Sequence, residues 1–237
     1  MYRYETHLHT FPVSKCARCD VRENLEFYKS IGYDGVFITN HFLDGNINID
    51  RSLSYEEKLR FYFSDYEEAL QIGKEIGIRV FLGVELSLKG TDFLIYGLDC
   101  EWYFSHPEIM EMEKSKELEL MAQAGALIIQ AHPFREAAYI DHIRLFPRKV
   151  EGVECYNACR TDFENRMALW YTEQYGLLQF AGIDNHRAGN RESFAGMETA
   201  TPILDEADFV LQVRNQTAVP FSFVRPLEET EQEKALS

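Results

Sequence analysis

Apolar residues along this chain follow two alternating patterns. Short continuous apolar runs are typical of buried strands, and longer stretches with apolar residues three or four positions apart are typical of helices. The patterns predict helices over 21–30, 55–76, 108–124, 140–145 and 162–175. They predict strands over 5–9, 35–39, 79–86, 93–98, 127–131, 152–156, 178–183, 197–201 and 221–224. Because strands and helices alternate, we expect an α/β fold with a parallel sheet.

Polar residues that can bind a metal stand where the apolar strands end. In the first strand Glu5, His7 and His9 are two positions apart, so their side chains face the same side. Later apolar strands run into His41, Glu85, His132 and Asp184, and the last is followed by His186. Buried charged or imidazole groups cost free energy unless they are paired or bound to metal. Imidazoles and carboxylates that converge in this way are a donor set for divalent metals.

These residues are spread over most of the chain and meet only if the strand ends converge. The C-terminal ends of parallel strands converge at one mouth of a barrel. We therefore expect a barrel whose metal site lies at the C-terminal ends of its strands. The length of 237 residues suits one large domain, predicted over 1–226, followed by a charged and frayed tail over 227–237.

The formal net charge of −15 makes long nucleic acid a poor partner. Small phosphorylated substrates remain compatible with this charge, because a local metal ion outweighs a distant and screened surface charge. We expect no membrane partner, since the sequence has no apolar run of about 18 residues. The chain also starts without an apolar signal segment, which predicts a cytoplasmic location.

The five cysteines favour reduced thiols, because their number is odd. Cys16 and Cys19 have the spacing of half a structural zinc site. Cys155 and Cys159 could supply the other half, but their spacing is loose. A four-thiolate zinc site is therefore the weaker alternative, and Cys16 is of more interest as a neighbour of the first strand end.

The order of the ligands resembles that in the PHP superfamily, which includes histidinol-phosphatase-like enzymes and domains of bacterial DNA polymerases. The resemblance covers nearly the whole chain. It rests on His7-x-His9, Thr39-Asn40-His41, Gly83-Val84-Glu85, Ala131-His132-Pro133 and Gly182-Ile183-Asp184-Asn185-His186. It implies a distorted (β/α)7 TIM-like barrel and two or three divalent metal ions, usually zinc, manganese or iron. It also implies hydrolysis of phosphate esters.

The resemblance also implies roles for individual residues. A first metal would be held by His7, His9, Glu85 and Asp184. Glu85 would bridge to a second metal that His132 also binds, and His41 and His186 would hold a third. Glu85 and Asp184 would then be catalytic, because they hold the cations whose shared hydroxide attacks phosphorus.

The chain departs from the family pattern at the edge of the predicted site. Asn40 and Glu5 both stand where the family more often has aspartate. Asn40 lacks the negative charge that would orient His41, which predicts a weaker third metal. Some family members carry two additional histidines, one after the first strand and one after the sixth. Cys16 or a water would replace the first of these here, and Asn157 or a water would replace the second.

A phosphatase also needs cations that hold the ester and stabilise developing charge. The candidates in the loops near the predicted mouth are Arg135, Arg160, Arg187 and Lys15. We favour Arg135 and Arg187 because they lie close to His132 and His186 in sequence, and we expect Arg135 to take part in catalysis. Glu154 ends a strand, and either reaches the site or makes a structural hydrogen bond.

The leading hypothesis is a metal-dependent phosphoric monoester hydrolase, similar to histidinol phosphatases, that acts on a small phosphorylated metabolite. The alternative enzyme is a nuclease or nucleotide phosphodiesterase on the same scaffold, acting on dinucleotides or nucleoside monophosphates. A third hypothesis is a non-catalytic metal-binding regulatory domain, which Asn40 and the absent peripheral histidines suggest. The retained Glu85 and Asp184 weigh against it.

Overall fold

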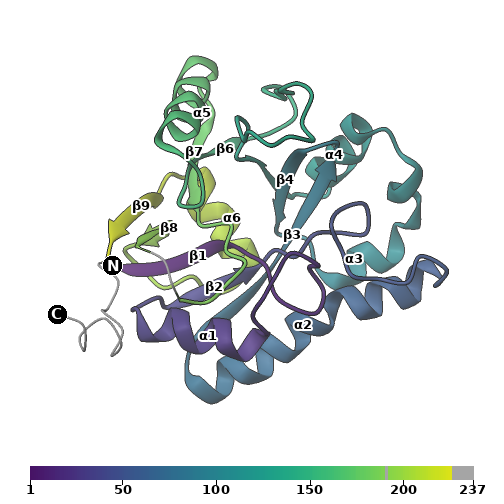
Figure 1. The fold of residues 1–237 in the computed structure, drawn as a ribbon, viewed down its shortest axis with the longest axis horizontal. Helices are drawn as coiled ribbons and strands as arrows, with labels where there is room; N and C mark the ends of the chain where they lie inside the picture. Colours follow the sequence, from purple (N-terminus) through teal and green to yellow (C-terminus); the bar gives the residue numbers. More distant parts are fainter. Residues whose placement is uncertain (190–191, 226–237) are drawn as a thin grey trace.

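The computed structural model describes residues 1–189 and 192–225, and its centre is one strongly curved sheet (Figure 1). The strand order is β7-β6-β5-β4-β3-β2-β1-β8-β9. The strands are β1 Tyr2–Leu8, β2 Gly35–Ile38, β3 Arg79–Leu88, β4 Thr91–Tyr96, β5 Leu127–Ala131, β6 Gly152–Asn157, β7 Leu178–Gly182, β8 Ser193–Thr199 and β9 Ala218–Val224. The helices are α1 Val21–Ser30, α2 Tyr55–Ile76, α3 Cys100–Ser105, the 3₁₀ helix η1 Pro107–Glu111, α4 Lys114–Gln123, α5 Asp162–Tyr175 and α6 Glu206–Arg214.

The sheet joins two parallel blocks with three antiparallel strands. The blocks β1–β3 and β5–β7 are parallel, as the alternation of strands and helices predicts. Strand β4 runs antiparallel between them, because the turn at Lys89 and Gly90, both with positive φ, reverses the chain directly after β3. Strands β8 and β9 extend the edge beside β1, also antiparallel.

The curvature of the sheet brings β1 close to the end of β7. Leu8 and Asn185 form a parallel bridge. The N–H of His9 donates to the carbonyl oxygen of Asn185 at 3.0 Å, and the N–H of Asn185 donates to the carbonyl oxygen of His7 at 3.1 Å. The sheet is therefore a nearly closed barrel, and the predicted α/β, distorted TIM-like barrel is confirmed. The described sheet has nine strands where a (β/α)7 barrel has seven, because β8 and β9 extend one edge.

Helices α2 and α5 carry sequence signals at both ends. Ser54 and Thr161 cap their N-termini, each in a reciprocal capping box with a glutamate three residues later. Gly77 and Gly176 end them with φ of 77° and 62°, a conformation that glycine adopts without strain. Both helices span the predicted 55–76 and 162–175. Figure 1 shows α1 and α2 together along one side of the sheet, with α5 beside β6 and β7.

Helix α6 closes the end of the barrel opposite the predicted site. The ring of Phe209 on α6 packs 4.2 Å from that of Phe37 and 5.3 Å from that of Tyr96, measured between centroids. All three rings are fully buried. Burial of such a side chain contributes about 1.5–3 kcal/mol. Arg214 at the end of α6 pairs with Glu151, which directly precedes β6, so α6 lies at the N-terminal ends of the parallel strands.

Several predicted elements differ in the structure. Segment 140–145 is not helical, because its polar groups bond to neighbouring segments instead of to a helix. The guanidinium of Arg144 donates to the carbonyl oxygen of Lys89, and the carbonyl oxygen of Arg144 accepts from the amide of Gln130. The predicted helix over 108–124 is divided into η1 and α4, while α3 and α6 were not predicted.

The predicted boundary between the domain and its tail falls at the edge of the described residues. The tail over 227–237 lies outside them. Among the helices of residues 1–189 and 192–225, none combines the length and the apolar character that a membrane crossing requires.

Candidate metal centre

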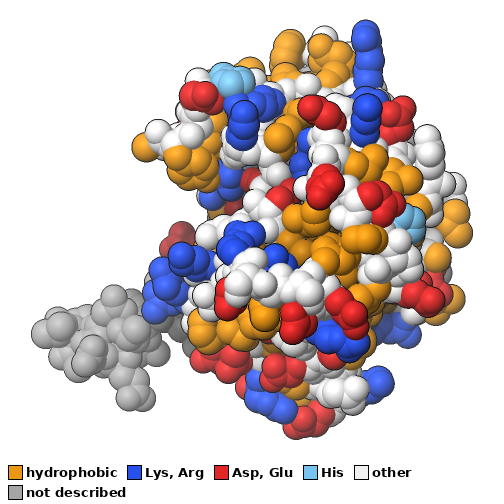
Figure 2. Space-filling model, turned by 90° about the vertical axis from the view of Figure 1, so that its right-hand side faces the viewer, with side chains coloured by type: hydrophobic (Ala, Val, Ile, Leu, Met, Phe, Trp, Pro, Cys, Tyr) orange, Lys and Arg blue, Asp and Glu red, His pale blue; other side chains and the backbone are white. Residues whose placement is uncertain are grey.

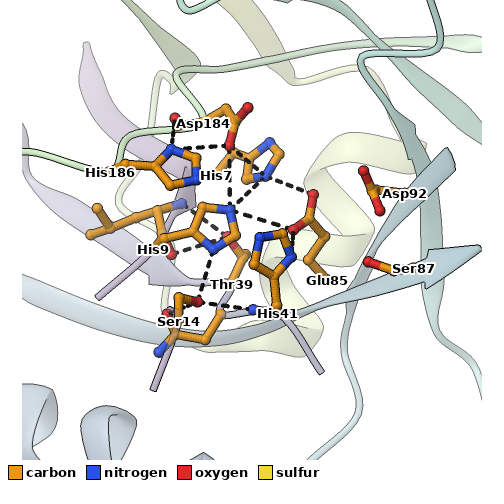
Figure 3. A network of polar contacts seen from close by, with 12 residues as sticks. His7, His9, Ser14, Thr39, His41, Glu85, Ser87, Asp92, Asp184 and His186 are labelled. Carbon is orange, nitrogen blue, oxygen red and sulfur yellow. Dashed lines mark hydrogen bonds and ion pairs between the residues drawn. The ribbon is translucent and has the colours of Figure 1, made fainter. Parts of the chain in front are cut away.

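The seven predicted metal ligands converge at the mouth of the barrel, and Figure 3 labels all of them except His132. His7 lies in β1 and His9 directly follows it, and Glu85 lies in β3. The remaining four follow the ends of β2, β5 and β7, and they are His41, His132, Asp184 and His186. All of them are buried except His186, which is half-buried. The convergence of the strand ends thus brings together residues that are up to 179 positions apart in the sequence, as predicted.

The innermost contacts join three histidines with two carboxylates. The Nε2 atom of His7 lies 3.1 Å from Oε1 of Glu85 and 3.3 Å from Nε2 of His9. The Nε2 atom of His9 lies 3.3 Å from Oδ1 of Asp184. The Nε2 atom of His132 lies 3.6 Å from Oε1 of Glu85. Donor atoms of His7, Glu85 and His132 lie within 4.8 Å of one another, and so do those of His7, His9 and Asp184.

A further group of donors lies beside this cluster, toward the cleft. Donor atoms of His9, Cys16, His41 and His186 also lie within 4.8 Å of one another. Cys16 is half-buried in the loop between β1 and α1. The sequence predicted either this thiol or a water in place of a histidine, and the structure puts the thiol among the imidazoles.

The carboxylates and one imidazole are in the protonation state that metal binding needs. Burial raises the pKa of Glu85, but the charges of His41 and His7 outweigh it and hold this pKa well below its ordinary value. The pKa of Asp184 is also held well below its ordinary value, since its contacts with His7 and His9 outweigh burial. Burial and the charge of His41 lower the pKa of His9 to about 3, so its ring is neutral at pH 7.

Other groups of the cluster hold protons that a cation would replace. Burial lowers the pKa of His7 and His41, but the carboxylates of Glu154 and Glu85 respectively raise it well above its ordinary value. Burial raises the pKa of the Cys16 thiol, but hydrogen bonds to the two neighbouring imidazoles outweigh it and bring the pKa down to about 6. The cluster therefore concentrates negative charge that is balanced either by protons or by metal ions.

Several buried polar atoms of the cluster have no hydrogen-bond partner among the described residues. They are Oε2 of Glu85, Nδ1 of His41 and both ring nitrogens of His132. Leaving such an atom unsatisfied costs about 1–3 kcal/mol. The backbone is strained at two of the predicted ligands, with φ of 23° at His132 and 60° at Asp184. Such strain concentrates at functional sites. Cations that bind the unpartnered atoms would offset these costs, so the residues present fit divalent metals.

Solved structures with the same architecture exist at low sequence identity. A two-domain protein from Bacteroides vulgatus, containing a predicted PHP-like metal-dependent phosphoesterase, matches with a TM-score of 0.63 and 12% identity. The match covers 99% of this chain and 68% of that protein. The chain has the PHP fold. The resemblance inferred from the motifs is thereby confirmed for the architecture.

Two further solved structures are similar in fold to this chain. PsfC from Pseudomonas syringae matches with a TM-score of 0.56 and 15% identity, over 100% of this chain and 95% of PsfC. An amidohydrolase from Chromobacterium violaceum, with bound sulfate and no metal, matches with a TM-score of 0.53 and 12% identity. That match covers 80% of this chain and 89% of the amidohydrolase. No family model matches the sequence, and no curated protein is significantly similar to it.

Glu154 holds two of the predicted metal ligands in place. Its Oε1 atom lies 2.9 Å from Nδ1 of His7, and its Oε2 atom accepts from the backbone N–H of His132 at 3.0 Å. Glu154 is fully buried. Asn157 donates to the same Oε2 atom at 2.9 Å, and its own oxygen accepts from the N–H of Cys159. Of the two readings that the sequence left open for Glu154, the structure shows the hydrogen bond.

Asn40 has a different neighbourhood from the one that the sequence predicted. Its side chain makes no hydrogen bond to the ring of His41 among the described contacts. The Oδ1 atom accepts from the N–H of Thr10 and from the hydroxyl of Ser14, both at 2.7 Å, and Nδ2 lies 3.2 Å from Oδ2 of Asp65. Ser14 in turn contacts Nδ1 of His9 at 3.1 Å. Asn40 therefore fixes the loop after β1 and acts on the centre through Ser14.

Only some of the predicted cationic residues reach the centre of the PHP fold. Arg135 lines a cleft of about 510 Å³ that also contains His41 and His186. Its Nη2 atom donates to the buried Asp92 at 2.8 Å, a partner that the sequence did not reveal. Arg160 lies outside this cleft lining, but its Nη2 atom is 3.7 Å from Oδ2 of Asp184. The other two candidates, Lys15 and Arg187, are exposed, and neither is among the described residues that line the cleft.

Proposed function

We propose that this chain is a metal-dependent phosphoesterase that hydrolyses a small phosphorylated metabolite, most simply a phosphate monoester. The observation that carries the proposal is the convergence of seven ligands, several with unsatisfied buried atoms, beside a cleft that contains an arginine. Structural neighbours described as metal-dependent phosphoesterases support it, although the shared fold does not fix the substrate. We expect two or three ions of zinc, manganese or iron, because imidazole and carboxylate donors bind all three.

The first task of the chain's own residues is to hold the cations. Glu85 and Asp184 supply negative charge, and His7, His9 and His132 supply nitrogen donors on the same side. When bound, divalent cations in such a centre act as Lewis acids toward a phosphoryl oxygen and make water a stronger nucleophile at neutral pH. Burial of these ligands excludes bulk water, which strengthens every electrostatic interaction at the reacting phosphorus.

The second task is to orient the ester. Arg135 faces the cleft, and its Nε hydrogen has no partner among the described residues. Asp92 holds the other end of the guanidinium, so the arginine is oriented before a substrate arrives. Burial lowers the pKa of Arg135, but the charge of Asp92 outweighs it and raises this pKa, so the side chain stays cationic. A guanidinium in this position stabilises charge that develops on phosphate oxygens.

The cleft and the surface favour a small substrate. The lining combines the acidic Asp44 and Asp92 with the basic Lys89 and Arg135, which suits a compact phosphorylated molecule better than a polyanion. On the face drawn in Figure 2, acidic and basic side chains are interspersed and form no continuous basic stripe. Together with the net charge of −15, this supports a reaction that does not involve long nucleic acid. We expect the enzyme to act in the cytoplasm.

Phosphate release from a panel of phosphorylated metabolites tests the proposal. The panel should include histidinol phosphate and AMP, together with a dinucleotide and a phosphodiester reporter. We expect a monoester to be hydrolysed by the metal-loaded protein, with loss of at least about a thousandfold in the Asp184→Asn variant. Asp162→Asn, which changes an exposed carboxylate at the start of α5, is the matched control.

Each other outcome of this panel selects a different reading. Cleavage of the dinucleotide or the diester alone would favour the nucleotide phosphodiesterase. A metal-loaded protein without activity on any of these classes would favour a non-catalytic metal-binding domain. Activity that survives both Asp184→Asn and His9→Ala would refute a reaction at this centre.

A further inference from the structure

Cys16, in the loop after β1, lies beside three imidazoles at the edge of the inner carboxylate cluster. Donor atoms of Cys16, His41, His186 and His9 lie within 4.8 Å of one another. We propose that the thiolate of Cys16 is a ligand of the third metal that the family resemblance assigns to His41 and His186, and that this thiolate makes the outer site select a thiophilic ion such as zinc. The proposal shares with the proposed function the premise that the cluster binds metal, but it does not depend on phosphate ester hydrolysis.

The loop holds Cys16 in place through backbone hydrogen bonds on both sides. The N–H of Lys15 donates to the carbonyl oxygen of Asn46 at 2.9 Å. The N–H of Arg18 donates to the carbonyl oxygen of His186 at 2.8 Å, which ties the loop to one of the proposed ligands. The thiol is therefore positioned by the backbone of the folded chain, as a metal ligand needs to be.

The ring of His186 is already in the orientation of a ligand. Its Nδ1 atom lies 2.8 Å from the carbonyl oxygen of Asp184, an oxygen that can only accept a hydrogen bond. The proton is thus held on Nδ1, and the lone pair of Nε2 is left for a metal. A hydrogen bond of this kind from the other ring nitrogen to a carbonyl is the usual support of a metal-binding histidine.

The ring of His41 supplies the second, independent sign of a missing ligand. Its Nδ1 atom is buried and has no hydrogen-bond partner among the described residues. It lies 2.5 Å from Oε2 of Glu85, a second buried atom without a hydrogen bond among the described residues. These two atoms form an ion pair only if the ring is protonated, and a cation bound beside them would satisfy both.

The proposed donor set differs in softness from that of the inner cluster. The inner cluster combines imidazoles with the carboxylates of Glu85 and Asp184, a mixture that accepts zinc, manganese or iron. A thiolate prefers zinc and other soft ions and disfavours manganese. The chain would therefore bind zinc at the outer site even where manganese fills the inner cluster, and the two kinds of site would load differently.

Cobalt substitution is the direct test, because thiolate coordination of Co²⁺ gives a charge-transfer band in the near ultraviolet. The full chain is stripped with chelator, reloaded with Co²⁺, and its spectrum and metal content are measured. We expect the band in the wild-type protein and in Cys19→Ser, which removes a cysteine of the same loop. We expect Cys16→Ser to lose the band and about one equivalent of metal.

A second variant separates loss of the ligand from loss of the fold. Cys16→Asp keeps a negatively charged donor but replaces sulfur by oxygen, so we expect it to retain its metal content. Its preference for zinc over manganese at the outer site should fall at least about tenfold. If both variants unfold, the wild-type protein alone decides, because zinc should protect Cys16 from alkylation by iodoacetamide at least about tenfold.

The outcomes distinguish this proposal from the proposed function. A wild-type protein that binds metal and hydrolyses phosphate esters, but shows no thiolate band and no protection of Cys16, would overturn the outer site alone. A thiolate band in a protein without hydrolytic activity would support the outer site and count against the proposed function. Failure to bind any metal would overturn both.

Discussion

Replacement of Glu154 by glutamine probes how the fold prepares its central ligand. Oε1 of Glu154 lies 2.9 Å from Nδ1 of His7, so the carboxylate holds a ring proton on Nδ1 and Nε2 is the atom that can bind a metal. Oε2 accepts from the N–H of His132 and from Nδ2 of Asn157. A glutamine keeps these two hydrogen bonds only if its oxygen takes the place of Oε2, and its NH₂ group, a donor, then faces His7. The ring must then accept at Nδ1 and carry its proton on Nε2, the atom that lies among the ligands.

The expected size of this effect follows from the loss of one such support. Removing a partner that orients a metal-binding histidine weakens metal affinity about 10–100-fold, which corresponds to about 1.4–2.7 kcal/mol. The loss of folding stability should be of similar size, about 1–3 kcal/mol, because one buried charge-assisted hydrogen bond is exchanged for a weaker one.

Zinc affinity, measured by competition with a chromophoric chelator, checks this prediction, and circular dichroism confirms that the variant is folded. Glu151→Gln is the matched control, because Glu151 precedes the same strand but pairs with Arg214 far from the centre. We expect wild-type affinity in the control. A folded Glu154→Gln protein that binds zinc as tightly as the wild type would refute the idea that this carboxylate sets the state of His7.

Three further predictions concern the charge, the packing and the loop of the centre. Metal affinity should rise with pH between about 6 and 8, roughly tenfold per unit for each proton released. The reason is that the raised pKa values of His7 and His41 keep both rings protonated until a cation displaces the protons. Chelator competition across this pH range measures the slope. Gly182→Ala should destabilise the fold by about 1–3 kcal/mol in chemical denaturation, since a methyl group there would lie 2.7 Å from the β-carbon of His7. Asn40→Asp should destabilise the fold by about 3–5 kcal/mol in the same assay, because it places a second buried carboxylate 3.2 Å from Asp65 and removes the donor between them.

The residues that converge at the candidate centre could be predicted because their signal is local. A polar residue that ends an apolar run is visible at Glu85 or Asp184 without knowledge of the partners. The capping boxes and terminal glycines of α2 and α5 are equally local, and both helices were predicted at their observed bounds. The barrel followed from these two kinds of signal, since strand ends that carry ligands have to converge.

The contacts that tune the centre depend on pairings between distant segments. Asp92 lies opposite Ala131 because β4 folds back as a hairpin and pairs antiparallel with β5, and this register brings it to Arg135. No periodicity in the sequence specifies that pairing. Likewise, the segment over 140–145 has apolar residues suited to a helix, but hydrogen bonds of Arg144 to the hairpin turn and to Gln130 hold it in an irregular loop.

The role of Asn40 shows the same limit at a single residue. Compared with the family pattern, its missing charge suggested a weaker metal site beside His41. In the structure its amide oxygen accepts a hydrogen bond from the loop after β1, and its amide nitrogen donates one to the carboxylate of Asp65. An aspartate cannot make the second contact without repulsion, so the substitution is explained by a buried partner that only the fold reveals.

Metal content per chain is the measurement that tests the central claim most directly. The protein should be purified without chelator or tag-bound metal, and zinc, manganese and iron should be quantified by elemental analysis. The convergence of the ligands predicts about two to three equivalents per chain, and about one fewer in Cys16→Ser. Less than about one equivalent in the wild-type protein, persisting after reconstitution with each metal, would contradict a metal centre at the mouth of this barrel.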